Sequence, residues 1–198
     1  MRHRVRVWLQ GRSAPAMILL LDIDCTLNRL HPPTARSIRD LAPEELRGTN
    51  GRAFWEWAIA HLSSVVYPPH EEAFETLRLL SSHASAIFVN TGRPEALRAA
   101  SERWLRRHLV VDTIWMRAAD DFRMTTEVKR ANLAQLLCFH RPADIYAFED
   151  NPATLRCYKE AGITSLRAPH CWSKLRQALR GETTEDRLAE ILKCHAFS

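Results

Sequence analysis

Several sequence features that mark particular protein classes are missing from this chain. Its apolar run near the N-terminus, Met17 to Leu21, is too short for a signal peptide or a membrane span, so neither is expected. The five cysteines are odd in number, and no pair has metal-site spacing, which favours reduced thiols and a cytoplasmic protein. No GxxxxGK[ST] loop occurs, so no P-loop kinase is expected.

Lysine is also scarce, and arginine therefore supplies nearly all of the positive charge. The net charge is +5 and the isoelectric point about 9.2. A basic surface attracts phosphate-rich partners, although genome composition alone would give the same arginine content, and the sequence favours neither explanation. With 198 residues, of which 46% are hydrophobic and 26% charged, the chain has enough apolar side chains for the core of one globular domain.

Apolar segments of strand length alternate along the chain with segments of helix length. The stretch 19–27, LLLDIDCTL, opens with a leucine-rich run that is typical of a buried parallel strand. Strands that alternate with helices predict an α/β fold with a doubly wound, mostly parallel, Rossmann-like sheet. The further strands are predicted at 86–90, 110–115, 145–148 and 164–166, and the helices at 53–62, 70–81, 95–105, 125–137, 152–160, 174–179 and 185–193.

The chain is predicted to form a single domain over residues 17–198, preceded by a basic segment over residues 1–16. That segment is expected to be either disordered or an extra strand. Within the domain, residues 28–67 leave room for at most a small helical cap, whereas the stretch from Thr91 to Lys129 is too short for one. The aromatic residues of the cap region, Phe54, Trp55 and Trp57, are expected to join the core or to stack on a base or sugar.

Two carboxylates, Asp22 and Asp24, stand where the first strand ends, and Thr26 adds a hydroxyl beside them. Crowded carboxylates at a buried strand end are costly unless a cation or a reaction requires them. Considered alone, the pair has two equally good explanations. It is either part of a functional site or a pair of solvated acids at a strand end, with Asp24 as a turn or capping residue.

Polar residues also follow two other predicted strands. Thr91 and Gly92 follow the second, Glu149 and Asp150 follow the fourth, and Lys129 lies near the start of a helix. The carboxyl ends of parallel strands meet at one edge of the sheet, where α/β proteins bind their ligands. Each residue has a plainer explanation, as a turn, a helix cap or a solvated lysine. Their joint occurrence at one edge favours a functional site.

This set of side chains is suited to phosphoryl transfer. Carboxylates from two strands can hold Mg²⁺, which prefers oxygen ligands. One carboxylate can attack phosphorus to form an aspartyl-phosphate, and a second can protonate the leaving oxygen and later activate water. A hydroxyl and backbone amides at a helix N-terminus can hold phosphate oxygens, and a lysine can offset the negative charge of the transition state.

Asp22-Ile23-Asp24-Cys25-Thr26, Thr91, Lys129 and Glu149-Asp150 together resemble the four motifs of the haloacid dehalogenase (HAD) superfamily, over residues 17 to about 166. The resemblance implies that Asp22 is the nucleophile and Asp24 the general acid and base. It also implies that Thr91 and Lys129 bind and stabilise the phosphoryl group, with Thr26 and Gly92 beside it.

The same resemblance implies a Mg²⁺ site made by Asp22, the Asp24 carbonyl and Asp150, with Glu149 in support. An aspartate at the acid/base position is the pattern of the phosphatases and phosphotransferases. Cys25 departs from the family pattern, because glycine usually follows the second aspartate, and a slight distortion of the turn is therefore expected.

A narrower resemblance concerns the order and spacing of short motifs in residues 91–129. It is similar to the phosphatase half of phage polynucleotide kinase/phosphatase, which removes 3′-phosphates from nucleic-acid ends. By this resemblance Arg93 and Arg117 contact phosphate; otherwise they are ordinary surface arginines. The matching segments are Thr91-Gly92-Arg93, Trp104-Leu105, Trp115-Met116-Arg117, Asp121-Phe122-Arg123 and Glu127-Val128-Lys129.

The sequence thus predicts a Mg²⁺-dependent phosphatase with phosphorylated substrates, nucleic-acid ends among them. A small-molecule phosphatase such as a nucleotidase uses the same residues and is the alternative. A receiver-like signalling domain fits less well, because Lys129 precedes Asp150 in this chain. A catalytically inactive phosphate-binding module also fits less well, because no motif residue is missing. No protein partner is predicted.

Overall fold

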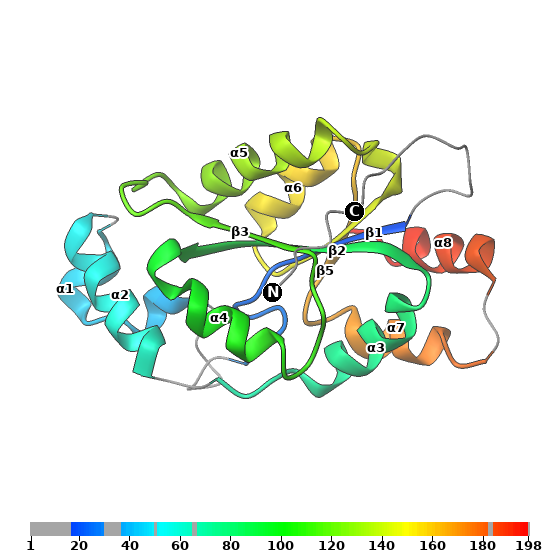
Figure 1. The fold of residues 1–198 in the computed structure, drawn as a ribbon, viewed down its shortest axis with the longest axis horizontal. Helices are drawn as coiled ribbons and strands as arrows, with labels where there is room; N and C mark the ends of the chain where they lie inside the picture. Colours follow the sequence, from blue (N-terminus) through cyan, green and yellow to red (C-terminus); the bar gives the residue numbers. More distant parts are fainter. Residues whose placement is uncertain (1–16, 30–36, 50, 65–66, 182–183, 198) are drawn as a thin grey trace, which may run out of the picture.

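The computed structural model describes residues 17–29, 37–49, 51–64, 67–181 and 184–197 (Figure 1). Five strands form one fully parallel sheet in the order β3-β2-β1-β4-β5. They are β1 (Met17–Leu21), β2 (Ala84–Pro94), β3 (Thr113–Arg117), β4 (Ile145–Glu149) and β5 (Thr164–Arg167). The doubly wound α/β prediction is confirmed. The predictions for residues 1–16 lie outside the described residues.

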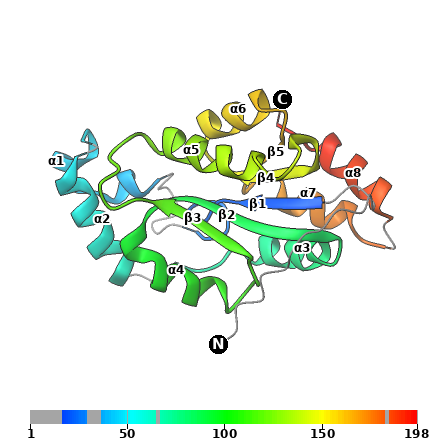
Figure 2. The same cartoon turned by 45° about the horizontal axis from the view of Figure 1, so that its top comes forward.

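Helices cover both faces of this sheet. Figures 1 and 2 show α5 and α6 on one face, and α3, α4 and α7 on the other. The helices are η1 (Ile38–Leu41), α1 (Glu44–Arg47), α2 (Arg52–Ser64), α3 (Glu71–Ser81), η2 (Glu95–Leu97), α4 (Arg98–Leu105), α5 (Thr125–Leu137), η3 (Pro142–Asp144), α6 (Pro152–Glu160), α7 (Trp172–Ala178) and α8 (Glu185–Cys194). None of the helices in the described part of the chain is long and apolar enough to cross a membrane.

The central strand β1 is buried along its whole length because both of its faces pack on helices. Met17, Leu19 and Leu21 join the apolar cluster that contains the α3 and α7 side chains. Ile18 and Leu20 join a second cluster with side chains of α5 and α6. A strand covered on both faces has no polar positions, which explains its uninterrupted apolar sequence.

Several element boundaries differ from those predicted. β2 continues to Pro94, beyond the predicted end at Asn90, and pairs with Arg117 of β3 there. β3 begins at Thr113 rather than Val110. The Val110 side chain is 86% exposed, and the first backbone hydrogen bond to β2 is the one from the Asp112 N–H to the Ile87 carbonyl. The predicted helix over 95–105 begins as the short η2, and α7 begins at 172 rather than 174.

A helical insertion, made of η1, α1 and α2, follows β1 in the chain. Figure 1 shows α1 and α2 beyond the end of the sheet toward which the strands point. Ala42, Phe54, Trp55 and Ala58 form a small apolar cluster of their own within it. Small helical elements are therefore present in the region predicted to hold a cap, of which residues 30–36, 50 and 65–66 lie outside the described residues.

Candidate active site

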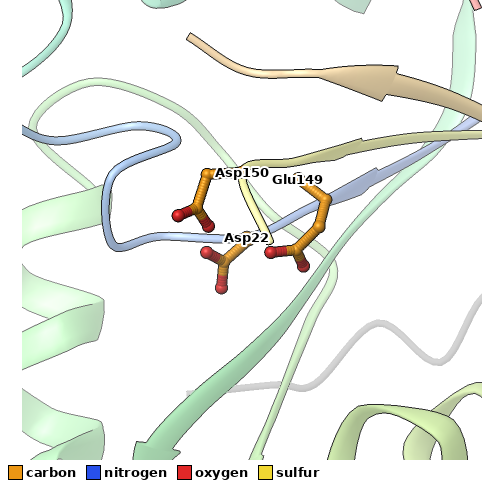
Figure 3. Close-up of side chains that lie close together, drawn as sticks. All are labelled: Asp22, Glu149 and Asp150. Atoms are coloured by element: carbon orange, nitrogen blue, oxygen red, sulfur yellow. The ribbon is translucent and has the colours of Figure 1, made fainter. Parts of the chain in front are cut away.

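Three carboxylates converge at the carboxyl edge of the sheet. Asp22 directly follows β1, Glu149 is the last residue of β4, and Asp150 comes next. The Asp22 backbone N–H donates to the Phe148 carbonyl at 3.0 Å, which fixes the end of β1 beside the end of β4. Carboxylate oxygens of the three acids lie within 4.8 Å of one another (Figure 3). Sequence positions far apart are thus joined because β1 and β4 are neighbours.

Lys129, which α5 carries, lies between two of these carboxylates. Its Nζ is 2.7 Å from Asp22 Oδ1 and 2.6 Å from Glu149 Oε2, and the residue is 2% exposed. Burial alone would lower the pKa of Lys129, but the two carboxylates outweigh it and hold the pKa well above its usual value. The ammonium group therefore stays charged beside Asp22.

Asp22, Glu149 and Asp150 carry more charge than Lys129 can offset. Burial, together with this charge, raises the pKa values of Asp22 and Asp150. Burial raises the pKa of Asp22 to about 7, against the opposing effect of Lys129. Burial, followed by the Glu149 and Asp22 charges, raises the pKa of Asp150 to about 9. Excess negative charge in a desolvated cluster of hard oxygen ligands is the arrangement that a divalent cation such as Mg²⁺ relieves. The residues present therefore fit the ion that the sequence predicts.

A buried amide pair fixes the part of α5 that carries Lys129. The Asn90 side-chain amide donates to the Lys129 carbonyl and to the Tyr158 hydroxyl, both at 2.9 Å. Asn132 donates to the Asn90 side-chain oxygen at 3.0 Å. The sequence analysis missed this network. The signal that could have revealed it is an asparagine at the end of an otherwise apolar strand.

Asp24, two residues after Asp22, has a different partner. Arg93 donates two hydrogen bonds to the Asp24 carboxylate, from Nε to Oδ2 at 2.8 Å and from Nη2 to Oδ1 at 2.6 Å. Asn28 donates to the same carboxylate at 3.0 Å, and Ser101 accepts from Arg93 Nη1 at 3.2 Å. Burial raises the pKa of Asp24, but Arg93 outweighs it and the net pKa is lowered. Arg93 thus reaches the site by binding a carboxylate.

The turn after β1 places Cys25 in the left-handed region, with φ at +61°. Among the described residues it is the one non-glycine with a positive φ. A Cβ in that region is disfavoured by about 1–2 kcal/mol, which explains why glycine suits this turn better. The turn is fixed because the Cys25 backbone N–H donates to Asn28 Oδ1 at 3.0 Å. Burial raises the pKa of the Cys25 thiol, which disfavours a reactive thiolate there.

Thr91 and Gly92 lie at the edge of the same cavity, and Thr26 lies close by. Thr26 Oγ1 is 3.4 Å from Asp22 Oδ2, and Thr91 Oγ1 accepts the backbone N–H of Arg93 at 3.3 Å. A Cβ on Gly92 would lie 2.6 Å from Thr125 Cγ2, so the close approach of the two segments requires glycine.

Arg117 is placed differently from the predicted phosphate contact. It is 1% exposed and does not line the cavity. Its Nε donates to the Gly92 carbonyl at 3.1 Å, and its Nη1 donates to the Asp121 and Arg123 carbonyls at 2.9 and 2.7 Å. The guanidinium therefore binds backbone carbonyls next to the cavity and does not face the cavity itself. Burial, which dominates, lowers its pKa to about 10.

The cavity has a polar wall and an apolar wall, and its volume is about 320 Å³. The polar wall includes Asp22, Asp24, Thr91, Arg93, Lys129 and Asp150. The apolar wall comes mainly from the helical insertion and includes Ile38, Phe54, Trp55 and Leu62, together with Met124; the insertion also contributes the polar side chains of Ser37 and Arg39. Phe54 and Trp55 thus pack in the small cluster of the insertion and also face the cavity.

No protein-family model and no curated protein matches the chain. Solved structures do match it. The Pnkp1/Rnl/Hen1 RNA repair complex matches with a TM-score of 0.55 and 14% identity, over 84% of this chain and 47% of that chain. A haloacid dehalogenase-like hydrolase from Streptococcus pneumoniae has a TM-score of 0.53 and 14% identity, over 89% and 91%. CbbY from Rhodobacter sphaeroides, in complex with phosphate, has a TM-score of 0.51 and 16% identity, over 78% and 86%.

This chain therefore spans about half the length of the chain it matches in the repair complex, at 47% coverage. Identities at this level establish the fold alone. The fold is HAD-like, as the sequence motifs predicted.

Proposed function

We propose that this protein is a divalent-metal-dependent phosphatase that works through an aspartyl-phosphate on Asp22. The observation that carries the proposal is the Asp22–Lys129–Glu149 arrangement at one wall of the cavity, with Thr91 and Asp24 on the same wall. A carboxylate that contacts a buried ammonium can attack phosphorus while the ammonium offsets the charge that develops on the phosphoryl oxygens.

The first half-reaction transfers the phosphoryl group to the protein. An Asp22 oxygen forms a bond to phosphorus as the ester P–O bond breaks, and Asp24 gives its proton to the leaving oxygen. In the second half-reaction, Asp24 takes a proton from water. The water oxygen bonds to phosphorus, and the bond to Asp22 breaks, which releases inorganic phosphate and restores the Asp22 carboxylate and the protonated Asp24.

Asp22 and Asp150 would hold the Mg²⁺ ion together with the Asp24 carbonyl, and Glu149 would hold Lys129 beside them. When bound, the ion supplies positive charge that lowers the repulsion between Asp22 and the phosphoryl oxygens. The excess of carboxylates over cations in the cluster supports this assignment.

Arg93 has two roles in this scheme. It binds Asp24 with two bonds, and it lies on the cavity wall beside Thr91 and Gly92. A bound phosphate dianion would compete with Asp24 for the guanidinium, since both are anions that suit bidentate binding. Substrate binding would then release Asp24 for proton transfer.

We further propose that the substrate is a 3′-phosphorylated nucleic-acid end. The net positive charge favours a polyanion, and the edges of Phe54 and Trp55 that line the cavity offer apolar contact to a sugar or base. The similarity to a chain of an RNA repair complex agrees with this choice. A nucleotidase is the alternative, because a mononucleotide offers the cavity the same groups.

The test is release of inorganic phosphate, with Mg²⁺ and with excess chelator, from a substrate panel. The panel contains 3′- and 5′-phosphorylated oligonucleotides, the matching mononucleotides and a sugar phosphate. The highest kcat/KM is expected for the 3′-phosphorylated oligonucleotide, with no release in chelator. Preference for mononucleotides would establish the nucleotidase instead. The absence of release from every substrate by folded, Mg²⁺-supplied protein would contradict the phosphatase proposal.

A further inference from the structure

The Arg117 side chain contacts three separate segments of the molecule: the end of β2, residues 121–125, and α2. Besides the Gly92, Asp121 and Arg123 carbonyls, its Nη2 donates to Thr125 Oγ1 at 3.2 Å, at the start of α5. Its guanidinium carbon lies 4.2 Å from the centroid of the Trp55 ring. Trp55 belongs to α2, so this contact is a cation–π bond between the insertion and the body of the fold.

The Arg117 guanidinium is buried, and most of its contacts are to uncharged groups. Within the described residues, Asp121 is the carboxylate in ion-pair range, at 4.0 Å, and it binds Arg123 more closely, at 2.6 Å. Carbonyl oxygens and the Trp55 ring therefore make most of the contacts, beside Asp121, to a cation whose side chain is 2% exposed. A desolvated guanidinium gains more from an aromatic face than an exposed one does.

The segments that Arg117 joins are those that bound the cavity. Gly92 and Thr125 lie at its polar edge, and Trp55 lies on its apolar wall. Gly92 and Thr125 are also in tight contact with each other. Arg117 therefore contacts residues of both walls, although Arg117 does not line the cavity itself.

We propose that Arg117 is a positioning residue that latches the helical insertion to the Thr91–Gly92 loop through the Trp55 ring. With the latch closed, α2 is held against the site and the apolar wall stands over Asp22 and Thr91. The inference depends on the proposed function only for what the walls bind, because the latch itself is a property of the unliganded chain.

Hydrogen–deuterium exchange of the unliganded protein, followed by mass spectrometry, tests the latch. Trp55→Leu and Arg117→Lys should each speed the exchange of the α2 amides by about tenfold, the scale of a desolvated cation–π contact. The β1 and β4 amides should be unchanged. Because both variants weaken the Arg117–Trp55 contact, besides other contacts of each residue, their effects on α2 exchange in the double variant should be less than additive.

Trp57→Leu is the matched control. Trp57 is on the same helix, but its ring stacks on His61 at a centroid distance of 5.0 Å. Its effect on α2 exchange should add to that of Arg117→Lys. Additivity for Trp55→Leu as well, or unchanged α2 exchange in Arg117→Lys, would overturn the latch.

A second measurement keeps the proposal testable if Arg117→Lys does not fold. A latch is reciprocal, so Trp55→Leu should also speed exchange in residues 118–125, across the contact, whereas Trp55→Phe, which keeps an aromatic face, should not. Unchanged exchange at 118–125 in Trp55→Leu would refute the coupling.

Turnover gives a further readout. Trp55→Leu should raise KM with little change in kcat, since it leaves Asp22 and Lys129 in place, and Arg117→Lys should change both constants. If the protein turns over no phosphate ester while the exchange results hold, the proposed function fails and the latch stands.

Discussion

Asp22 and Asp24 are separated by one residue, yet their surroundings differ. Asp22 contacts Lys129 and two further acids, and its pKa is raised. Asp24 is held by Arg93, and its pKa is lowered. Without a cation this order is the reverse of the one that the proposed roles need, since a nucleophile must be ionised and an acid protonated. Mg²⁺ beside Asp22 would lower the pKa of Asp22, and release of Asp24 from Arg93 by the substrate phosphate would raise the pKa of Asp24. The strand end explains the difference: Asp22 still faces β4, whereas Asp24 has turned toward β2.

The acid role of Asp24 predicts a dependence on the leaving group. Asp24→Asn should lower kcat/KM by about 10²–10⁴-fold for an alkyl phosphate, whose leaving oxygen needs a proton. The loss should be much smaller for p-nitrophenyl phosphate, whose leaving group departs as an anion. Steady-state kinetics of both substrates measure the ratio, and Asp186→Asn, an exposed aspartate in α8, is the control. Equal losses for the two substrates would exclude Asp24 as the acid.

The sequence predicted which residues reach the cavity better than it predicted what they contact. Asp22, Thr91, Lys129 and Asp150 lie together because each follows a parallel strand or begins a helix at one edge, and such positions can be read from spacing. The burial of Arg117 could not be predicted. It depends on the Gly92 carbonyl and the Trp55 ring, which are distant in the chain, as well as on the nearby Asp121 and Arg123 carbonyls, and local sequence does not encode the distant contacts.

At the scale of elements, the β2 end and the α5 start are packed so closely that Gly92 is required. Gly92→Ala would place a Cβ 2.6 Å from Thr125 Cγ2, which belongs to a short β-branched side chain with few χ1 rotamers, so a segment must shift. Chemical denaturation should show a loss of about 1–3 kcal/mol in the free energy of unfolding.

Two further variants identify the cause of that loss. Adding Thr125→Ser removes Cγ2 but keeps the hydroxyl that binds Arg117, so it should recover part of the stability. Gly48→Ala, where nothing lies within 4 Å of the added Cβ, should be nearly neutral. No recovery in the Gly92→Ala, Thr125→Ser double variant would show that the strain has another source.

Element positions followed from the sequence where a regular period was present. Strands buried on both faces and helices with an apolar stripe, such as α3, were predicted within a few residues. The end of β2 was placed too early, because a Thr-Gly-Arg-Pro stretch reads as a turn, whereas pairing with β3 extends the strand there. The short helices of the insertion carry too few residues to show a period.

At the scale of the whole molecule, the acidic cluster predicts how the metal affects stability. Asp150 is repelled by Glu149 and Asp22, so Asp150→Asn should raise the melting temperature in chelator. Mg²⁺ should raise the melting temperature of the unmodified protein, by an amount equivalent to about 2.7 kcal/mol at 100 times Kd. The same variant should lose this increase.

Thermal denaturation with chelator and with Mg²⁺ measures both effects. Asp186→Asn should keep the Mg²⁺ increase, because it leaves the carboxyl edge unchanged. An Asp150→Asn variant that is stabilised by Mg²⁺ as much as the unmodified protein would place the ion elsewhere.

The covalent step on Asp22 is the central claim, and trapping it is the most direct test. The protein is mixed with substrate and Mg²⁺, quenched in acid within the first turnover and reduced with borohydride, which converts an acyl phosphate to an alcohol. Peptide mass spectrometry should then find homoserine in place of aspartate at position 22, and at no other acid. Phosphate release with position 22 unmodified, or with the modification at Asp24, would contradict the account.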